Sequence, residues 1–523
     1  MKMTIKHTFC LLAAASALAS CYEDKGNYSY SETPVITATG LPASLSVVQK
    51  ADYIELTPTF TSSTEGDISD NPNYEFGCNL WMNGGSFEDT KKRYRDIDSL
   101  HTKDIRYFAD LNEGTYLAWY TVTDKRTGVT TNFKVPIKVT SATYEGWLVL
   151  CDDKEGNARL DMVSVLSADR VSAVHDLLGS KAASLKGGTC LYYDPWYRYA
   201  KGDGIWYCTE SGSYSLNANT LKPMYNVAES EFVSPPEGEQ VVYMDGTFMG
   251  NNFAITDKGN LYRKNAVSYG AAFEDPINTF EVDGEPSFHV APFIATCANR
   301  PQPWQELIAV FYDTDHKQFV SWYQYSANSG KCCMKMEDPE NKLFSYQTGM
   351  DMLHMESTKF NGGVIYSVLR DDAGKRYVYG INYASGNYTQ TYAQQMTAPG
   401  FDQATTFAFH SQYPYMFYNA GDKVYPYQLL TNTAMTPVTL PGEEVTLVKF
   451  NLFKHTQTQL TDQSDEFMAK QYMLIVGSYK KDATDGNGGI LRFYKFDQST
   501  GSLTLVDEYT GFGRIKDVAY RER

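Results

Sequence analysis

The chain has 523 residues, of which 42% are hydrophobic, 21% are charged and 14% are aromatic. This hydrophobic fraction is enough for a packed core and excludes a chain that is disordered throughout. The net charge of −16 argues against a nucleic-acid-binding protein, because such proteins need a basic surface to contact phosphates.

Residues 1–20 have the organisation of a signal peptide. Lys2 and Lys6 precede an apolar stretch at residues 9–18, which is too short to cross a bilayer. The sequence Leu-Ala-Ser-Cys at residues 18–21 resembles the bacterial lipobox, in which the leader is removed and the cysteine is lipidated. We therefore expect Cys21 to anchor the mature chain, and we expect this lipid to be its only membrane attachment.

Residues 21–33 are predicted to form a tether. The acidic pair Glu23 and Asp24 follows the lipidated position and resembles the surface-export signal of Bacteroidetes lipoproteins. The expected location is therefore the outer membrane, with the protein facing the extracellular medium. The alternative is that these residues are simply part of a polar tether. The remaining cysteines are scattered without a CxxC pair, which indicates neither a zinc site nor a reliance on disulfides.

Residues 34–141 are predicted to form a small β-sandwich. Hydrophobic residues alternate with polar ones at residues 133–139, as in a half-buried strand, and Pro136 predicts that this strand lies at an edge. Residues 116–123 and 74–81 are predicted as further strands, with Trp81 in the core. This order resembles that of PKD-type immunoglobulin-like domains, although their Trp-Asp-Phe-Gly-Asp signature is absent.

Residues 142–523 repeat a pattern of strand, polar turn and strand. The first strands of these hairpins are predicted to begin at intervals of 48 to 58 residues, near Trp147, Ile205, Phe253, Leu307, Val364, Tyr415 and Tyr472. All-β units of this length predict a β-propeller of seven blades, to within one blade. The alternative is a pair of β-sandwiches.

The two ends of this region are predicted to pair with each other. Residues 514–520 read as a strand with no hairpin after it, whereas the hairpin at Trp147 has no strand of its own before it. A ring must join its first and last blades, so we expect the C-terminal strand to complete the first blade. One helix is predicted between Ser167 and Gly179, from the spacing of Val171, Val174 and Leu177.

Catalytic patterns are absent. The sequence has no HExxH and no GxSxG motif, so we predict neither an enzyme nor a catalytic residue, cofactor or metal. Acidic turns near Asp153, Asp313 and Asp485 offer too few oxygens for calcium. Cysteine and methionine at residues 332–336 and 350–355 include soft copper ligands, but packing explains them better.

An aromatic segment is the best candidate for a binding site. Trp196, Tyr197, Arg198 and Tyr199 follow Pro195 in a predicted irregular loop. Exposed rings at this position would stack on sugars or hold a peptide. The alternative is a buried strand, in which the same alternation occurs. The segments 413–415 and 425–427 are weaker cases of the same kind.

The leader, the sequence Cys-Tyr-Glu-Asp-Lys-Gly-Asn-Tyr at residues 21–28, the PKD-like domain and the propeller together resemble the PKD-like family of Bacteroidetes lipoproteins. Members are typically encoded beside SusC/SusD-type importers, in which a TonB-dependent barrel is lidded by a surface lipoprotein. The resemblance implies a non-catalytic accessory subunit that partners the importer and its accessory lipoproteins and captures or presents a glycan or an oligopeptide. A propeller hydrolase or lyase acting on a surface polymer, and a structural scaffold, stay open as alternatives.

Overall fold

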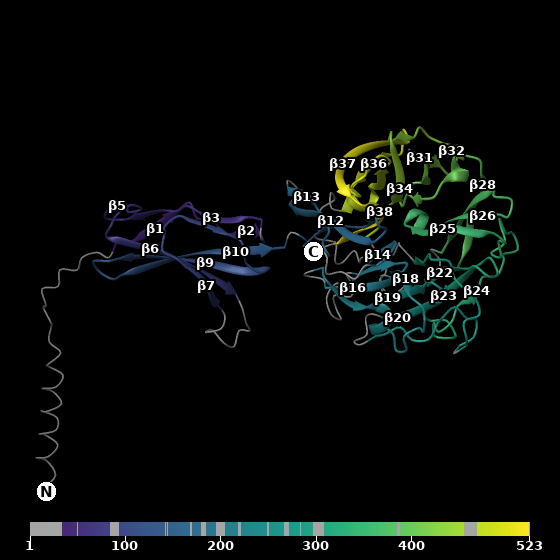
Figure 1. Ribbon diagram of the computed structural model, residues 1–523, viewed down its shortest axis with the longest axis horizontal. Coiled ribbons are helices and arrows are strands. Elements are labelled where there is room, and N and C mark those ends of the chain that lie inside the picture. Colours follow the sequence, from purple (N-terminus) through teal and green to yellow (C-terminus); the bar gives the residue numbers. More distant parts are fainter. Residues whose placement is uncertain are drawn as a thin grey trace, which may run out of the picture. The chain divides into compact units, whose positions relative to one another are not determined.

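The computed structural model of the chain describes residues 34–49, 51–83, 94–141, 143, 145–167, 170–178, 185–194, 204–217, 221–247, 250–265, 271–282, 284–296, 308–383, 387–453 and 468–521. The chain divides into two compact units, Met1–Thr140 and Ser141–Arg523. Both units are built from β-strands (Figure 1). The predicted all-β fold is therefore confirmed.

Unit 1 is a sandwich of antiparallel strands with one parallel pair. A five-stranded sheet has the order β2 (Leu45–Val48), β10 (Thr130–Thr140), β9 (Gly114–Asp124), β6 (Tyr74–Asn83) and β7 (Tyr94–Leu100). Two smaller sheets contain β1 (Ile36–Thr39), β4 (Thr59–Ser62) and β5 (Gly66–Asp67), and β3 (Tyr53–Leu56) with β8 (Ile105–Phe108). One hydrophobic core joins these sheets, with Ile54, Phe60 and Tyr120 completely buried.

The strands predicted in unit 1 are present, with two corrections. The alternation along β10 matches its burial, since Val135, Ile137 and Val139 are buried and the residues between them are exposed. However, β10 is not an edge strand, because β2 pairs with it from Ile137 onward. Pro136 lies just outside this pairing, where its missing N–H leaves no gap in the ladder.

Trp81 does not lie in the core. In β6 the buried face carries Tyr74, Cys78 and Leu80, so the odd-numbered Trp81 points to the other face of the sheet. There it stacks on Trp119 of β9, with ring centroids 5.0 Å apart. The prediction took Trp81 as buried because of its size and overlooked its place in the alternation.

Unit 2 contains seven successive antiparallel sheets in the part of the chain that is described. From its inner to its outer strand, the first sheet has the order β38 (Arg514–Arg521), β11 (Gly146–Asp152), β12 (Ala158–Ser167) and β13 (Arg170–Val174). The second has β14 (Gly188–Asp194), β15 (Gly204–Thr209), β16 (Gly212–Leu216) and β17 (Pro223–Asn226). The third has β18 (Val241–Gly246), β19 (Asn251–Thr256) and β20 (Leu261–Asn265).

The other four sheets follow the same plan. The fourth has β21 (Ala295–Thr296), β22 (Ile308–Asp313), β23 (Gln318–Tyr323) and β24 (Met334–Lys335), and the fifth has β25 (Asp351–Thr358), β26 (Val364–Arg370), β27 (Arg376–Asn382) and β28 (Thr389–Met396). The sixth has β29 (Phe407–Phe409), β30 (Tyr415–Ala420) and β31 (Lys423–Gln428), which pairs with both β32 (Thr433–Ala434) and β33 (Val438–Thr439). The seventh has β34 (Glu443–Lys449), β35 (Leu474–Lys480), β36 (Gly489–Asp497) and β37 (Ser502–Phe512).

The hairpin starts predicted from the sequence fall within two residues of β11, β15, β19, β22, β26, β30 and β35. Each of these strands is the second from the inside of its sheet. Every residue of β11, β15 and β19 is buried, because neighbouring sheets cover both faces. A strand buried on both faces reads as a short continuous apolar run, which explains why this strand gives the strongest sequence signal.

The predicted pairing between the two ends of the region is confirmed. Strand β38 pairs antiparallel with β11, from Gly146 opposite Arg521 to Asp152 opposite Arg514. Hydrophobic clusters join each sheet to the next, and one of them joins the seventh sheet to the first. In that cluster the ring of Trp147 lies 4.9 Å from Phe493 and 4.7 Å from Tyr520. Figure 1 shows the sheets following one another around a common centre.

The helix predicted between Ser167 and Gly179 is wrong. Residues of this segment form β13, in which Val171 lies opposite Val165 and Val174 opposite Met162 of β12. Valine is β-branched and favours strands, and β12 offers a free edge to pair with. This long-range packing outweighs a helical spacing that rests on few apolar residues.

Helical segments are short in the described residues. They are α2 (Val227–Ser230), η4 (Phe360–Gly362), η5 (Phe401–Gln403) and η6 (Lys470–Tyr472). None of the described helices has the length and hydrophobicity needed to cross a membrane.

Candidate functional site

The inner strands of unit 2 surround its centre. Strand β38 contacts β34 on one side and β14 on the other, and contacts continue from β14 to β18 and from β21 through β25 and β29 to β34. In Figure 1 the labels of β14, β18, β25, β34 and β38 lie inside those of the outer strands. Side chains from these strands therefore meet near the axis of the unit.

An ion pair ties three neighbouring inner strands together. The Nζ atom of Lys449 in β34 lies 2.5 Å from Oδ1 of Asp517 in β38. The Oδ2 atom of Asp517 accepts a hydrogen bond of 2.8 Å from the backbone N–H of Leu191 in β14. Burial disfavours the ammonium group of Lys449, but the nearby carboxylate of Asp517 more than offsets this and raises the pKa of Lys449.

A bulge in β38 places Asp517 on the side of the strand that faces Lys449. The register between β11 and β38 shifts where Leu150 is followed by Cys151, which leaves Lys516 as the extra residue. Ile515, Val518 and Tyr520 then share one face and join the hydrophobic cluster between the seventh and first sheets. Asp517 points to the opposite face, toward Lys449.

A second group of polar side chains comes from β18 and β25. The Nε2 atom of His354 lies 3.3 Å from Oε2 of Glu356, and the other carboxylate oxygen of Glu356 accepts the backbone N–H of Phe409 in β29. Burial raises the pKa of the Tyr243 phenol in β18, and the negative charges of Asp245, Asp517 and Glu356 raise it further. One phenol thus senses carboxylates from three strands. We call this set the axial cluster; it consists of Tyr243, Asp245, His354, Glu356, Lys449 and Asp517.

The axial cluster suits binding and cohesion better than covalent catalysis. Asp517 already accepts hydrogen bonds from Lys449, Leu191 and its neighbour Val518. The thiol of Cys190 in β14 is a poor nucleophile because burial raises its pKa well above the ordinary value. No group of three or more His, Cys, Asp or Glu side chains in the described residues is placed to hold a metal ion.

The residues singled out from the sequence fall largely outside the described part of the chain. Cys21 precedes it, and Trp196, Tyr197, Arg198 and Tyr199 lie between β14 and β15, outside the described residues. The adjoining strand residues are core rather than surface. Tyr192 stacks on Trp206 with ring centroids 5.3 Å apart, and its hydroxyl donates to Oδ1 of Asn252 at 3.0 Å.

The weaker aromatic candidates also pack inside unit 2. Tyr415 and Tyr427 are buried, and Tyr425 stacks on the buried Tyr418 at 5.3 Å. Pro414 and Pro426 therefore belong to strand and turn geometry, and these segments offer no exposed aromatic surface of the kind that a sugar would need.

The possible metal ligands have structural roles. Oδ1 of Asp153 accepts the N–H groups of Glu155 and Asn157, and Oδ1 of Asp313 accepts those of Asp315 and His316. These are the hydrogen bonds of Asx turns. Cys332 and Cys333 are buried, and Cys333 belongs to the hydrophobic cluster between the third and fourth sheets.

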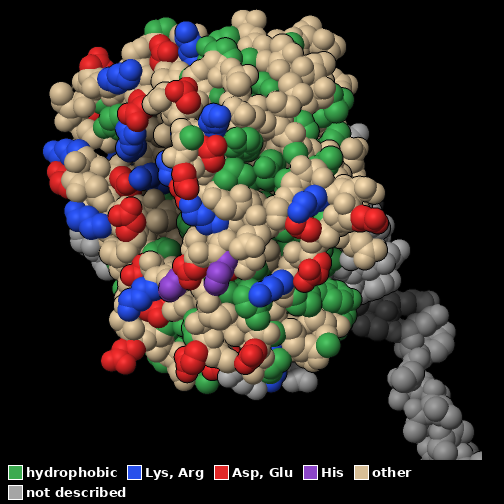
Figure 2. All heavy atoms as spheres, turned by 90° about the vertical axis from the view of Figure 1, so that its right-hand side faces the viewer, with side chains coloured by type: hydrophobic (Ala, Val, Ile, Leu, Met, Phe, Trp, Pro, Cys, Tyr) green, Lys and Arg blue, Asp and Glu red, His purple; other side chains and the backbone are tan. Residues whose placement is uncertain are grey.

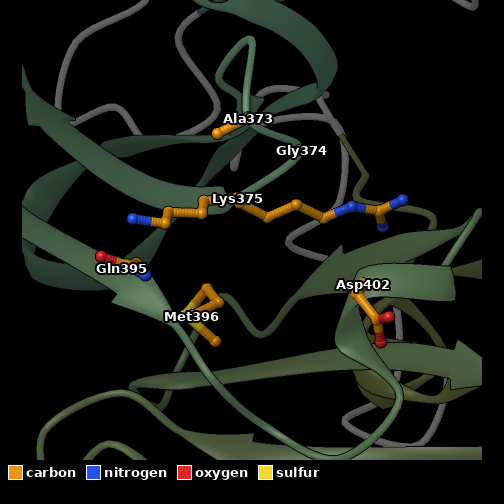
Figure 3. Close-up of a pocket in the computed structure, with 7 residues that line it drawn as sticks. Ala373, Gly374, Lys375, Gln395, Met396 and Asp402 are labelled. Carbon is orange, nitrogen blue, oxygen red and sulfur yellow. The ribbon is translucent and has the colours of Figure 1, made fainter.

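A small cavity lies between the fifth and sixth sheets. It has a volume of about 220 Å³ and is lined by Ala373, Gly374, Lys375, Arg376, Gln395, Met396 and Asp402. Figure 3 shows Lys375 and Gln395 on one side of this cavity and Asp402 on the other. Ligand pockets are commonly about 300–1,000 Å³, so this cavity is small for an organic ligand.

The surface of unit 2 has no dominant charge on the face shown in Figure 2, where acidic and basic side chains are interspersed over the described residues. Among the described residues of unit 2, and independently of this view, Lys317 lies 3.2 Å from both Asp351 and Asp372. This face thus lacks the basic stripe that a nucleic-acid-binding surface shows.

The axial cluster is not among the sites predicted from the sequence. A signal for it exists in hindsight, because the charged residues Lys449 and Asp517 lie directly beside the apolar residues Val448 and Val518. Such residues are buried at a cost unless they are paired.

Comparison with known proteins gives one sequence match and several structural likenesses. A profile of the PKD-like family matches residues 21–181. Among curated proteins, none matches the sequence. The match begins at Cys21 and extends past unit 1 into the first sheet of unit 2.

Among solved structures, a quinonprotein alcohol dehydrogenase-like protein from Bacteroides thetaiotaomicron is 11% identical with a TM-score of 0.41, covering 94% of this chain and 99% of its own. A putative 6-phosphogluconolactonase from Bacteroides fragilis is 13% identical with a TM-score of 0.43, covering 72% and 98%. A periplasmic gluconolactonase from Pseudomonas aeruginosa is 11% identical with a TM-score of 0.44, also covering 72% and 98%. No activity is carried from these proteins to this chain.

Proposed function

We propose that the protein is a non-catalytic lipoprotein, anchored at Cys21 in the outer membrane and facing the extracellular medium. Its seven sheets form a seven-bladed β-propeller that β38 closes. It acts as an accessory subunit of a SusC/SusD-type importer and captures or presents a glycan or an oligopeptide. The observation that carries the proposal is the match to the PKD-like family, which begins at the cysteine of the lipobox-like sequence.

The first experiment tests the proposed membrane anchor and surface location. Replacing Cys21 with Ala is expected to release the protein from membranes, because its lipid is the proposed attachment. Proteinase added to intact cells is expected to degrade the wild-type protein. Complete protection in intact cells, together with degradation after lysis, would contradict surface exposure.

The second experiment tests the partner. The tagged wild-type protein, solubilised in mild detergent from cells that express its neighbouring genes, is expected to copurify with a TonB-dependent barrel and its lipoprotein lid. A chain that migrates alone under these conditions contradicts the accessory role.

In the same preparation, replacing both Trp196 and Tyr199 with Ala is expected to weaken binding of the ligand or partner while the melting temperature stays near that of the wild type. A large loss of stability would instead place these rings in the core.

The axial cluster also favours a second candidate function, a hydrolase or lyase, because carboxylates and His354 converge near the axis. The contacts of these carboxylates argue against it, since Asp517 pairs with Lys449 of the neighbouring strand and Glu356 accepts the backbone N–H of Phe409 from β29. The variant Glu356→Gln separates the two functions. An enzyme loses polymer-degrading activity with little change in importer binding, whereas the accessory subunit has no such activity to lose.

A further inference from the structure

Two buried cysteines face each other across the second sheet. Strands β14 and β15 pair antiparallel with Cys190 directly opposite Cys208. Their side chains are 3% and 0% exposed. The Sγ atom of Cys190 also lies 3.4 Å from the backbone nitrogen and 3.7 Å from the carbonyl oxygen of Met244 in β18. The pair therefore lies where the second sheet packs against the third.

The backbone at this pair suits a disulfide. Directly opposed residues of antiparallel strands have Cα atoms about 4.5–5.5 Å apart, within the range of about 4.4–6.8 Å that disulfides span. Directly opposed residues point to the same face of a sheet, and both side chains belong to the hydrophobic cluster between the second and third sheets. No other pair of described cysteines is opposed in this way: Cys78 and Cys151 face other residue types, and Cys332 and Cys333 are consecutive.

We propose that Cys190 and Cys208 are joined by a disulfide bond in the mature protein. Each thiol gives up its proton, the two sulfur atoms form the new bond, and two electrons pass to a disulfide-containing oxidant that is released as two thiols. The compartment rests on the proposed function, because a chain exported through a lipoprotein leader meets such oxidants outside the cytoplasm.

The bond must form while the chain folds. The thiolate is the species that attacks a disulfide, and the burial of Cys190 raises its pKa and disfavours its thiolate in the folded protein. Once β14 has packed on β18, the pair is closed to exchange. The bond would fix the two strands that flank residues 195–203, and so hold the ends of the segment that contains Trp196 and Tyr199.

The decisive experiment maps thiols in the full mature protein. The protein is extracted from membranes without reductant, denatured, alkylated with N-ethylmaleimide and digested for mass spectrometry. We expect Cys78 and Cys151 to be alkylated at once, and the peptides of Cys190 and Cys208 to be linked and alkylated only after reduction. Immediate alkylation of both Cys190 and Cys208 overturns the proposal.

A refolding experiment tests the same bond independently of purification. Wild-type protein refolded with glutathione disulfide is expected to melt several degrees higher than protein refolded with dithiothreitol, whereas adding either reagent to the folded protein changes nothing. The variant Cys208→Ser is expected to melt at the same temperature under both refolding conditions, and the matched control Cys78→Ser to keep the difference. Equal melting temperatures of the two wild-type samples overturn the proposal. The thiol map decides the question if Cys208→Ser fails to fold, and neither measurement depends on an importer.

Discussion

The first and fifth sheets of unit 2 have the same number of strands but are assembled in different ways. The fifth sheet is one continuous stretch of chain, from β25 to β28. The first takes three strands from residues 146–174 and its inner strand from residues 514–521. The fifth sheet can therefore form from local hairpins, whereas the first cannot be completed until the last residues of the chain arrive.

The inner strand of the first sheet, β38, stabilises the junction between the first and seventh sheets. Strand β38 pairs with β11 through backbone hydrogen bonds, places Ile515 and Val518 in the cluster shared with the seventh sheet, and carries Asp517 to Lys449. Chain termini usually fray, but this one is buried nearly to its end; Arg521 is 0% exposed and donates to the carbonyl oxygen of Thr143. The C-terminus is thus a structural part of the closure.

Deleting residues 513–523 is expected to have the largest effect. The deletion removes Ile515, Val518 and Tyr520 from the core, and burying one such side chain contributes about 1.5–3 kcal/mol. The sum is comparable to the whole stability of a typical domain, about 5–15 kcal/mol. Scanning calorimetry of the truncated protein should therefore lose the transition of unit 2. Removing residues 522–523 alone is the control. A truncated protein that melts like the full-length one would contradict the closure.

Fragments that end at different points test the same comparison. A fragment of residues 21–140 contains unit 1 and is expected to be monomeric and to unfold cooperatively. A fragment of residues 21–181, which the family profile spans, adds β11 without β38. Leu148 and Leu150 are 0% exposed in the full chain, and an unpaired apolar edge strand promotes aggregation. Size-exclusion chromatography should show this longer fragment as aggregates, and a soluble monomer would count against the argument.

The pairing of β38 with β11 can be predicted from the sequence because each of these two strands has a recognisable sequence pattern. The hairpin at Trp147 lacks a preceding strand, and residues 514–520 form a strand without a hairpin. Local patterns also locate the second strand of every sheet, since burial on both faces gives an apolar run. Outer strands are harder to recognise: β28 alternates between exposed and partly buried residues, and β13 was mistaken for a helix because its apolar residues are few.

The axial cluster and the cysteine pair both depend on the register in which the strands pair. Lys449 and Asp517 are 68 residues apart, and Cys190 meets Cys208 only if β14 and β15 pair in one register out of several. A sequence shows which residue types are present in two strands but does not show how far one strand slides along the other. The bulge at Lys516, which turns Asp517 toward Lys449, is likewise invisible before the pairing is known.

Replacing Asp517 with Ala breaks the closure at a single side chain. The change leaves the ammonium group of Lys449 without its counter-charge and the N–H of Leu191 without its acceptor. Lys449 is 28% exposed, so most of the loss comes from the buried N–H groups of Leu191 and Val518, which lose this acceptor at about 1–3 kcal/mol each. Chemical denaturation should therefore show a loss of several kcal/mol. The matched control is the neighbouring Lys516→Ala. Lys516 pairs with Asp152 at 3.3 Å and is about as exposed as Lys449, but its side chain accepts no backbone N–H. Lys516→Ala therefore removes only a partly exposed ion pair, which contributes about 0–1 kcal/mol. Equal losses in the two variants would contradict the role given to Asp517.

The sixth sheet differs from the first in holding a buried histidine, which predicts a pH effect smaller than the losses above. His410 is 2% exposed and lies against Tyr413 and Phe450, whereas His175 beside the first sheet has a side chain that is 39% exposed. Burial lowers the pKa of His410 to about 4. The neutral ring is needed in the fold, because its Nδ1 atom accepts the N–H of Gln412 at 3.0 Å.

The sign follows from which state binds the proton first. As the pH falls below about 6.5, histidine in the unfolded chain takes up a proton, but His410 in the folded protein does not do so until about pH 4. The contribution of the neutral His410 ring to the free energy of unfolding is therefore complete above pH 6.5 and is lost progressively as the pH falls to 4. It amounts to about 3 kcal/mol. In the variant His410→Asn, whose amide oxygen can replace Nδ1 as the acceptor, denaturation between pH 7 and pH 4 should show that much less loss than the wild type. The same substitution at His289, whose side chain is 57% exposed, is the control for removing one histidine from the chain. If His410→Asn follows the wild-type pH profile, the ring is not held neutral by its burial between the sixth and seventh sheets.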